Sequence, residues 1–259
     1  MNALSNFASI VAANKVVVLD LEFLPDEQLY ARYVRLDPRP ARSRWPMKRV
    51  VAATVMSLRV ADGLLQVEHF KTFAGRDEGK LVSQLFAYFN ERADYRLVTW
   101  GGLNVDIPVL RIAAMEHALK LPLQLRPQAR DRRGWLHLDL CVEMKAGEYV
   151  HLSEVATRLN IPVKFGGCAA SIPHLVRKGD WRAIGWVCEA DVVSLACLFS
   201  SYLGMLGELS SAEASHHHIL SFVRGLRGEA PYSRYLGNVQ HRLRDNMKAE
   251  LSRWMARVA

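Results

Sequence analysis

The sequence lacks the cysteine patterns of zinc-binding or disulfide-stapled domains. Its four cysteines lie far apart and form no C-x-x-C pair, which favours free thiols in a reducing cytoplasm. No uninterrupted apolar run approaches the roughly 20 residues that span a bilayer. The N-terminus has no basic start followed by an apolar block and a cleavage site. We therefore expect a cytoplasmic globular protein without a membrane span.

Acidic residues are too few to balance the basic ones. The 34 Lys and Arg exceed the 26 Asp and Glu, which gives a net charge of +8 and a pI near 9.5. Such an excess favours polyanions, of which nucleic acid is the commonest in a cytoplasm. Two segments hold much of this basic excess, although an ordinary solvent-exposed loop would explain each segment equally well. Residues 32–49 hold seven basic residues against Asp37 alone, and residues 126–133 hold Arg126, Arg130, Arg132 and Arg133 around Asp131.

Hydrophobic periodicity predicts an α/β fold. The β-branched run at 16–23 is typical of a buried strand, and Asp62-Gly63 is a strong signal for a hairpin. Helical and strand patterns alternate after the hairpin, which indicates a mixed sheet with helices packed on it. A proline-bearing basic loop is expected through Pro46. The other expected elements are strands at 50–60, 64–73 and 97–100 and helices at 81–89, 107–119, 152–159 and 181–206.

The last fifty residues differ in character from the rest. Two helices are expected at 212–226 and 235–258, and residues 216–259 hold eight basic residues against three acids. We therefore predict a core domain over residues 1–208 and a basic helical extension over 209–259. The extension has three open roles, which are to lengthen a nucleic-acid track, to bind a partner protein, or to brace the sheet.

Four acids carry the chemistry of this sequence. Asp20 and Glu22 stand two residues apart on the first strand, so both carboxylates point to one face. A divalent cation is the usual compensation for two such acids, and oxygen-only ligation suits magnesium or manganese. Asp106 precedes a helix, and Asp191 lies inside an apolar one. Taken singly, each has an ordinary alternative, since the first pair can face solvent, Asp106 can be a helix cap, and Asp191 can be exposed.

In order and spacing, the four acids resemble those of DEDD-type 3′–5′ exonucleases, which have a ribonuclease-H-like fold. The run at 17–22 is similar to their first motif and the run at 188–193 to their third. The second motif, Thr99 to Leu110, resembles the version in predicted exonucleases related to the proofreading domain of family B DNA polymerases, and residues 137–140 resemble the segment that follows it. The resemblance covers roughly residues 15–205.

This resemblance implies a metal-dependent exonuclease acting on the 3′ ends of single-stranded DNA. Asp20, Glu22, Asp106 and Asp191 would hold two Mg²⁺ or Mn²⁺ ions, which activate water and stabilise the leaving 3′ oxygen. Asp139 is a weaker candidate for a supporting role, and Glu189 is better explained as structural. As candidate substrate-binding residues we add Phe23, Asn104, Trp186, Arg130, Arg132 and Arg133.

The sequence departs from the family pattern at the general base. The tyrosine class has Tyr four residues before the last Asp, where this chain has Val187, and the histidine class has His five before, where it has Trp186. The usual asparagine of the second motif falls at Gly101, and its aromatic residue falls at Val105. His151 and Tyr149 are possible substitutes for the base, but the sequence does not place them.

Two interpretations therefore compete. In the first, the chain is a 3′–5′ exonuclease, of reduced activity if nothing replaces the base, because a general base contributes about 10²–10⁴ in rate. In the second, it is a degenerate exonuclease fold that binds nucleic acid or a protein partner without cutting. The retained acids favour the first, and Val187 and Trp186 favour the second.

Overall fold

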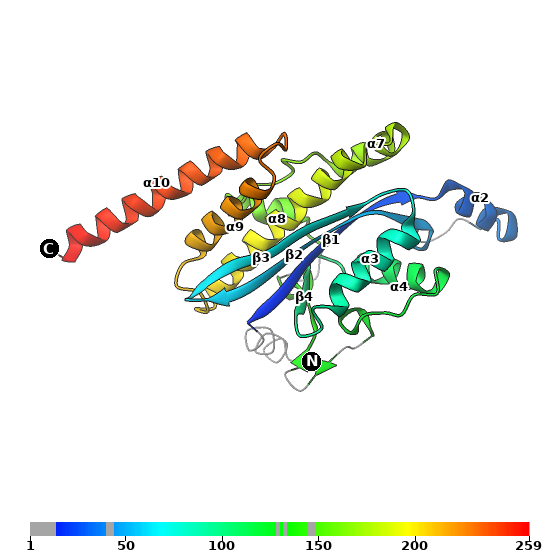
Figure 1. Ribbon diagram of the computed structural model, residues 1–259, viewed down its shortest axis with the longest axis horizontal. Helices are drawn as coiled ribbons and strands as arrows, with labels where there is room; N and C mark the ends of the chain where they lie inside the picture. The colour runs from blue at the N-terminus through cyan, green and yellow to red at the C-terminus, as the bar shows by residue number, and fades with distance from the viewer. Residues whose placement is uncertain (1–13, 40–43, 128–129, 132–133, 145–148, 259) are drawn as a thin grey trace.

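The computed structural model describes residues 14–39, 44–127, 130–131, 134–144 and 149–258. Its centre is a five-stranded sheet with the order β3-β2-β1-β4-β7. The first three strands are antiparallel, and β4 and β7 run parallel to β1. The strands are β1 (Lys15–Pro25), β2 (Lys48–Ala61), β3 (Leu64–Ala74), β4 (Arg96–Thr99) and β7 (His137–Asp139). This is the mixed, helix-flanked, ribonuclease-H-like sheet that the sequence predicts (Figure 1).

Local sequence explains the long hairpin. Asp62 and Gly63 both have positive φ angles, 53° and 71°, which suit a two-residue turn whose twist matches that of the flanking strands. The strands on either side are rich in β-branched residues, and the buried positions of β2 run almost without a break from Val50 to Leu58. The predicted hairpin is confirmed.

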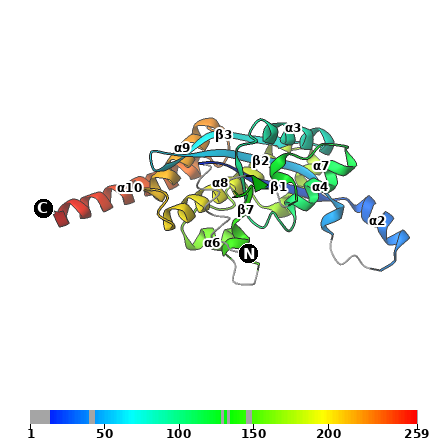
Figure 2. The same ribbon diagram turned by 90° about the horizontal axis from the view of Figure 1, so that it is seen from below.

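The two faces of β1 meet different helices. Val17, Leu19 and Leu21 belong to the core under α3 (Glu78–Asn90) and α4 (Asp106–Glu116). Val16 and Val18 belong to the core under α8 (Trp181–Met205), on the opposite face. Figures 1 and 2 show these layers with the sheet between them. Because strand side chains alternate with a period of two, the α8 face is also the face of Asp20 and Glu22.

The predicted loop before β2 is wrong over residues 27–36, which form helix α2 (Glu27–Leu36). Asp26 caps it, since its Oδ1 accepts hydrogen bonds from the backbone N–H groups of Gln28 and Leu29, both at 3.0 Å. The prolines that suggested a loop lie outside the helix, at Pro25 and Pro38. A short 3₁₀ turn, η1 (Trp45–Met47), then leads back into β2.

The C-terminal helices pack on the sheet layer. Side chains of α9 (Ala212–Leu226) and of the first turns of α10 (Ser233–Val258) share the core under α8. The far half of α10 projects away from the body (Figures 1 and 2). Whether 209–259 acts as a unit separate from 1–208 stays a prediction. The remaining elements are β5 (Arg130–Asp131), β6 (Gly134–Trp135), α5 (Leu140–Met144), α6 (Leu152–Arg158), α7 (Ile172–Lys178), η2 (Leu123–Leu125) and η3 (Ala169–Ser171).

Helix α8 is long and apolar enough to cross a bilayer by length and composition alone, with a mean hydropathy of 1.6 in its most apolar window. However, 83% of that window is buried inside the structure. A helix covered by a sheet on one side and by other helices around it is apolar because it forms the core.

Candidate active site

Asp20 and Glu22 lie in the middle and second half of β1, just before the strand changes its pairing. The register between β1 and β2 shifts between Glu22 and Phe23. Glu22 is buried, with 5% of its surface exposed, and Asp20 is partly exposed. Because strand side chains alternate, the side chains of Asp20 and Glu22 point to the same face of β1 as those of Val16 and Val18, which is the face that α8 covers.

Asp191 reaches the same point from α8. Carboxylate oxygens of Asp20, Glu22 and Asp191 lie within 4.8 Å of one another, one from each residue. The thiol of Cys188, one turn before Asp191, is 3.2 Å from the backbone carbonyl of Asp20, so the helix is seated directly against the strand. Segments about 170 residues apart in the chain therefore meet here, as the sequence predicts.

Asp106 lies beside this group but not within it. It is the first residue of α4, and 8% of its surface is exposed. Its charge is close enough to raise the pKa of both Asp20 and Glu22. All four predicted acids are thus gathered at one end of the sheet.

Burial and mutual repulsion make these carboxyl groups hard to ionise. Burial, followed by the charges of Asp191 and Glu22, raises the pKa of Asp20 well above its ordinary value. Burial and then Asp191 raise the pKa of Glu22 to about 7. Burial and then Asp139 raise the pKa of Asp106 to about 7. The pKa of Asp191 is also raised by burial, although the neighbouring ammonium group of Lys164 opposes the shift.

The donor set fits a hard divalent cation. One buried and two partly buried carboxylates, with no sulfur or imidazole ligand in the group, match the ligation that magnesium and manganese prefer. Positive charge would also relieve the repulsion that raises these pKa values. In the structure that charge comes from Lys164, whose Nζ lies 2.5 Å from Oδ2 of Asp191.

The comparisons with known proteins show the family of this chain. A family described as "Predicted 3'-5' exonuclease related to the exonuclease domain of PolB" matches residues 43–237. The chain belongs to this family. The match begins after β1, so the placing of Asp20 and Glu22 rests on the fold, and it continues through α9 into the start of α10.

Solved structures give weaker likenesses. The family B DNA polymerase from the archaeon Pyrobaculum calidifontis is 14% identical, with a TM-score of 0.46, and the match covers 80% of this chain and 29% of the polymerase. A product-bound exonuclease I is 11% identical, with a TM-score of 0.38, over 71% of this chain and 43% of that one. An exonuclease I in complex with SSB-Ct is 11% identical, with a TM-score of 0.40, over 74% and 46%. This chain therefore spans less than half of each. No curated protein matches.

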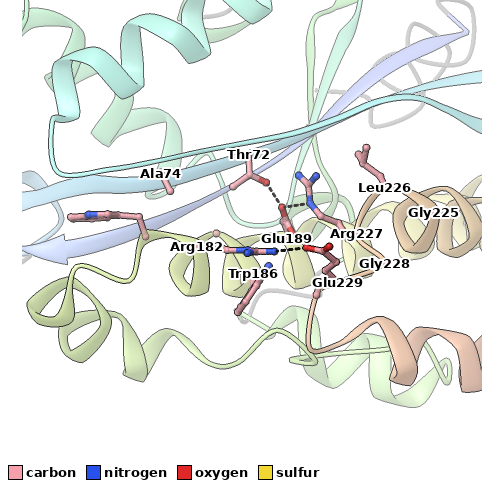
Figure 3. A pocket seen from close by; sticks show the side chains of 13 residues that line it. Thr72, Ala74, Arg182, Trp186, Glu189, Gly225, Leu226, Arg227, Gly228 and Glu229 are labelled. Atoms are coloured by element: carbon pink, nitrogen blue, oxygen red, sulfur yellow. Dashed lines mark hydrogen bonds and ion pairs between the residues drawn. The ribbon is translucent and has the colours of Figure 1, made fainter.

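The position at which the tyrosine class carries its general base is buried in this protein. Val187 has 1% of its surface exposed and belongs to an apolar cluster with residues of β2 and α7. Trp186 faces the other flank of α8. There it lines a cavity of about 700 Å³ between β3 and the loop after α9 (Figure 3). Five residues along a helix turn a side chain by about 140°, so Trp186 and Asp191 point in different directions from α8, and a substrate-binding role for Trp186 stays a prediction.

A tyrosine fills the space of the missing second-motif asparagine. Gly101 has φ of 69°, and a Cβ added there would lie 3.1 Å from Cε2 of Tyr149. The phenol is also near enough for the charges of Asp106, Asp139 and Asp20 to raise its pKa, after burial. The structure thus places Tyr149 at the site, which the sequence could not do.

Asp139 supports the turn that leads into α4. Its Oδ1 accepts a hydrogen bond from the Gly101 N–H at 2.7 Å, and its Oδ2 accepts one from the Leu103 N–H at 2.9 Å. Oδ1 also accepts from the Cys141 N–H at 3.1 Å. Its contacts are therefore with the backbone around Asp106, and they match the supporting role considered from the sequence.

We expect Asp139→Ala to destabilise the protein and to misplace Asp106. Two buried backbone donors, of Gly101 and Cys141, and the part-buried donor of Leu103 would lose their acceptor. Each such loss at a buried donor costs about 1–3 kcal/mol before relaxation. The expected fall in the free energy of unfolding is about 2–4 kcal/mol, measured by urea denaturation. Asp139→Asn keeps one acceptor oxygen and is expected to lose less. Equal stability of wild type and Asp139→Ala would contradict this role.

The remaining substrate-binding candidates are only partly located. Phe23 is half-buried under the ammonium group of Lys48, which lies 5.1 Å from its ring centre. Asn104 is exposed in the turn before α4. Arg130 lies on the short strand β5, and Arg132 and Arg133 lie outside the described residues. Their roles stay predictions. Lys164 was missed because a single lysine in an irregular segment carries no sequence signal.

Proposed function

We propose that this chain is a metal-dependent 3′–5′ exonuclease that hydrolyses the phosphodiester bonds of single-stranded DNA in the cytoplasm. The observation that supports this most is the meeting of Asp20, Glu22 and Asp191 within 4.8 Å, with Asp106 beside them. A binding module would gain nothing from buried anions that face phosphates, because their repulsion opposes both folding and binding.

Each acid has a defined task in the proposal. Asp20, Glu22, Asp106 and Asp191 would hold two Mg²⁺ or Mn²⁺ ions. When bound, such ions activate a water molecule and stabilise the leaving 3′ oxygen. Lys164 offers its ammonium group at the same place and would pair with the phosphate once Asp191 is engaged.

Among the described residues, Tyr149 is the best placed to stand in for the missing asparagine of the second motif. Its ring occupies the space next to Gly101, on the turn that carries Asp106. A phenol held there can donate a hydrogen bond to a phosphate oxygen or orient a water molecule. Because its pKa is raised, it acts as a hydrogen-bond donor at neutral pH and does not abstract a proton.

A second candidate function is a nucleic-acid or protein-binding domain that no longer cuts. The observation in its favour is the burial of Val187, which leaves no basic group at the family's usual position. The basic far half of α10 is a candidate surface for a protein partner in either case.

Digestion of end-labelled oligonucleotides tests the choice. With Mn²⁺, a 5′-labelled single strand is expected to give a ladder that shortens with time, and a 3′-labelled strand is expected to release labelled mononucleotide first. An RNA strand of the same sequence tests the preference for DNA, and Asp20→Ala controls for contaminating nucleases. Binding without any ladder would support the second candidate and overturn the first.

A further inference from the structure

Helix α2 and the turn η1 form an arm that leaves the sheet where β1 ends. We define the arm as residues 26–39 and 44–47. None of the residues of α2 is buried, and the helix extends outward from the end of the sheet (Figures 1 and 2). A ten-residue helix spans about 15 Å, so the arm reaches well past the strand end. Because α2 contributes no buried residue to the core, packing does not explain why the chain forms this helix.

The base of the arm is fixed. The Asp26 N–H donates to the Met47 carbonyl at 2.8 Å, which ties the two ends of the arm together. Arg49, just after the arm, pairs with Asp26 at 3.0 Å, with Glu78 at 3.0 Å and with Glu116 at 2.5 Å. These pairs join α2, α3 and α4, so the arm starts from an anchored base. The acidic group at Glu78 and Glu116 thus has Arg49 as a shared cation, and His117 contacts Glu78 as well, at 3.1 Å.

The outer surface of the arm is basic. Arg32 and Arg35 are exposed on one face of α2, and among the described residues no ion pair involves either of them. Arg44 stacks on the opposite side, 4.1 Å from the ring centre of Tyr30. Arg39 is neutralised by Asp37 at 2.7 Å.

The arm begins beside the acids. Phe23, at the end of β1, is one residue from Glu22, and its ring lies under Lys48, the first residue after the arm. The charge of Lys48 is close enough to lower the pKa of both Glu22 and Asp106. Lys48 therefore joins the two places, since its charge reaches the acids and it directly follows the arm in the chain.

We infer that the arm is a second binding surface, which holds the phosphate backbone of a single strand upstream of its 3′ end. This inference rests on the proposed function. Arg32 and Arg35 supply the phosphate contacts, and the anchored base keeps their position fixed relative to the acids. Because phosphate contacts carry no sequence information, the arm binds strands of any sequence.

Binding without cleavage tests the inference. Fluorescence anisotropy with labelled oligothymidine of about 12 nucleotides, within the site sizes of single-strand binders, is measured in EDTA over a range of salt. The Arg32→Ala/Arg35→Ala double variant is expected to lower the slope of log K against log[salt] by about 1.4, because each single-strand phosphate contact contributes about 0.7. A labelled dinucleotide is too short to reach the arm, so its binding is expected to change little.

The matched control removes the same charge elsewhere. Arg242→Ala/Arg244→Ala takes two exposed arginines from α10, at the opposite end of the molecule (Figure 1). Equal slopes for this variant and the arm variant would mean that only net charge matters, which would overturn the inference. Labelled polyglutamate that binds as tightly as the oligonucleotide, with the same dependence on Arg32 and Arg35, would also overturn it in favour of an acidic protein. Because EDTA removes cleavage, the binding result stands apart from the proposed activity.

Discussion

Asp20→Asn is expected to abolish cleavage and to stabilise the metal-free protein. The substitution removes one charge from a group in which burial and three neighbouring acids raise the pKa of Asp20. Loss of a single essential catalytic group lowers rates by about 10²–10⁴-fold or more. The same change relieves repulsion, so the free energy of unfolding at pH 8 is expected to rise by about 1–3 kcal/mol.

The pH dependence of stability follows from the same shifts. The pKa of Glu22 is near its ordinary value of 4.5 when the chain is unfolded and about 7 when it is folded. Between these values the folded protein binds more protons than the unfolded one, so stability falls as pH rises from about 4.5 to about 7. For Glu22 alone the full loss corresponds to roughly 3 kcal/mol. The metal-free wild type is therefore expected to melt at a higher temperature at pH 5.5 than at pH 8.

Thermal melts with and without metal measure both effects. Mn²⁺ at pH 8 is expected to raise the melting temperature of the wild type, because a ligand that binds only the folded state stabilises it. It is expected to raise that of Asp20→Asn much less. Asp245→Asn, at an exposed site on α10, removes a charge away from the acids and is the matched control. An Asp20→Asn variant that is less stable than wild type without metal would contradict the account of buried, repelling acids.

Glu189→Ala is expected to be the most destabilising single substitution considered for this protein. Glu189 is buried, with 3% of its surface exposed. It accepts hydrogen bonds from the Thr72 hydroxyl at 2.7 Å and from Nε of Arg227 at 2.9 Å (Figure 3). It also accepts one from the Tyr232 hydroxyl. One carboxylate thus joins α8, β3 and the chain between α9 and α10.

Removal of this carboxylate leaves the Arg227 guanidinium without its buried partner. Breaking such a pair costs about 3–5 kcal/mol, and at roughly 2–4 °C per kcal/mol the melting temperature is expected to fall by about 6–20 °C. Urea denaturation measures the change, and limited proteolysis is expected to cut first near the loop between α9 and α10. Glu189→Gln keeps the shape and part of the hydrogen bonding, so it is expected to lose less. A loss below about 1 kcal/mol for Glu189→Ala would show that the C-terminal helices are held by apolar packing alone.

Much of the site could be predicted from the sequence, because the hydrophobic pattern of a strand shows to which face each side chain points. Asp20 and Glu22 share a face because strand side chains alternate, and the burial of Val16 and Val18 indicates which face is covered. Asp106 could be placed because a helix start after a strand lies at the sheet's end.

The rest could not be predicted because it depends on contacts between distant segments. Lys164 meets Asp191 across 27 positions of the chain, and Tyr149 meets Gly101 across a segment with no regular pattern. Helix α2 was missed because prolines on both sides outweighed the signals of its own ten residues.

The unequal pairing of β1 with its two neighbouring strands bears on which part of the site unfolds first. On one side β1 pairs with β2 over eleven positions, whereas on the other it pairs with β4 over only three, and β4 pairs with β7 over three. Short ladders at a sheet margin open more readily than long hairpins, so amide protons of β4 and β7 exchange with solvent before those of β2. Asp106 and Asp139 belong to that margin, while Asp20 and Asp191 belong to the resistant part. On warming, the molecule then loses one wall of its acidic centre in a reversible, sub-global opening while the hairpin and α8 stay folded.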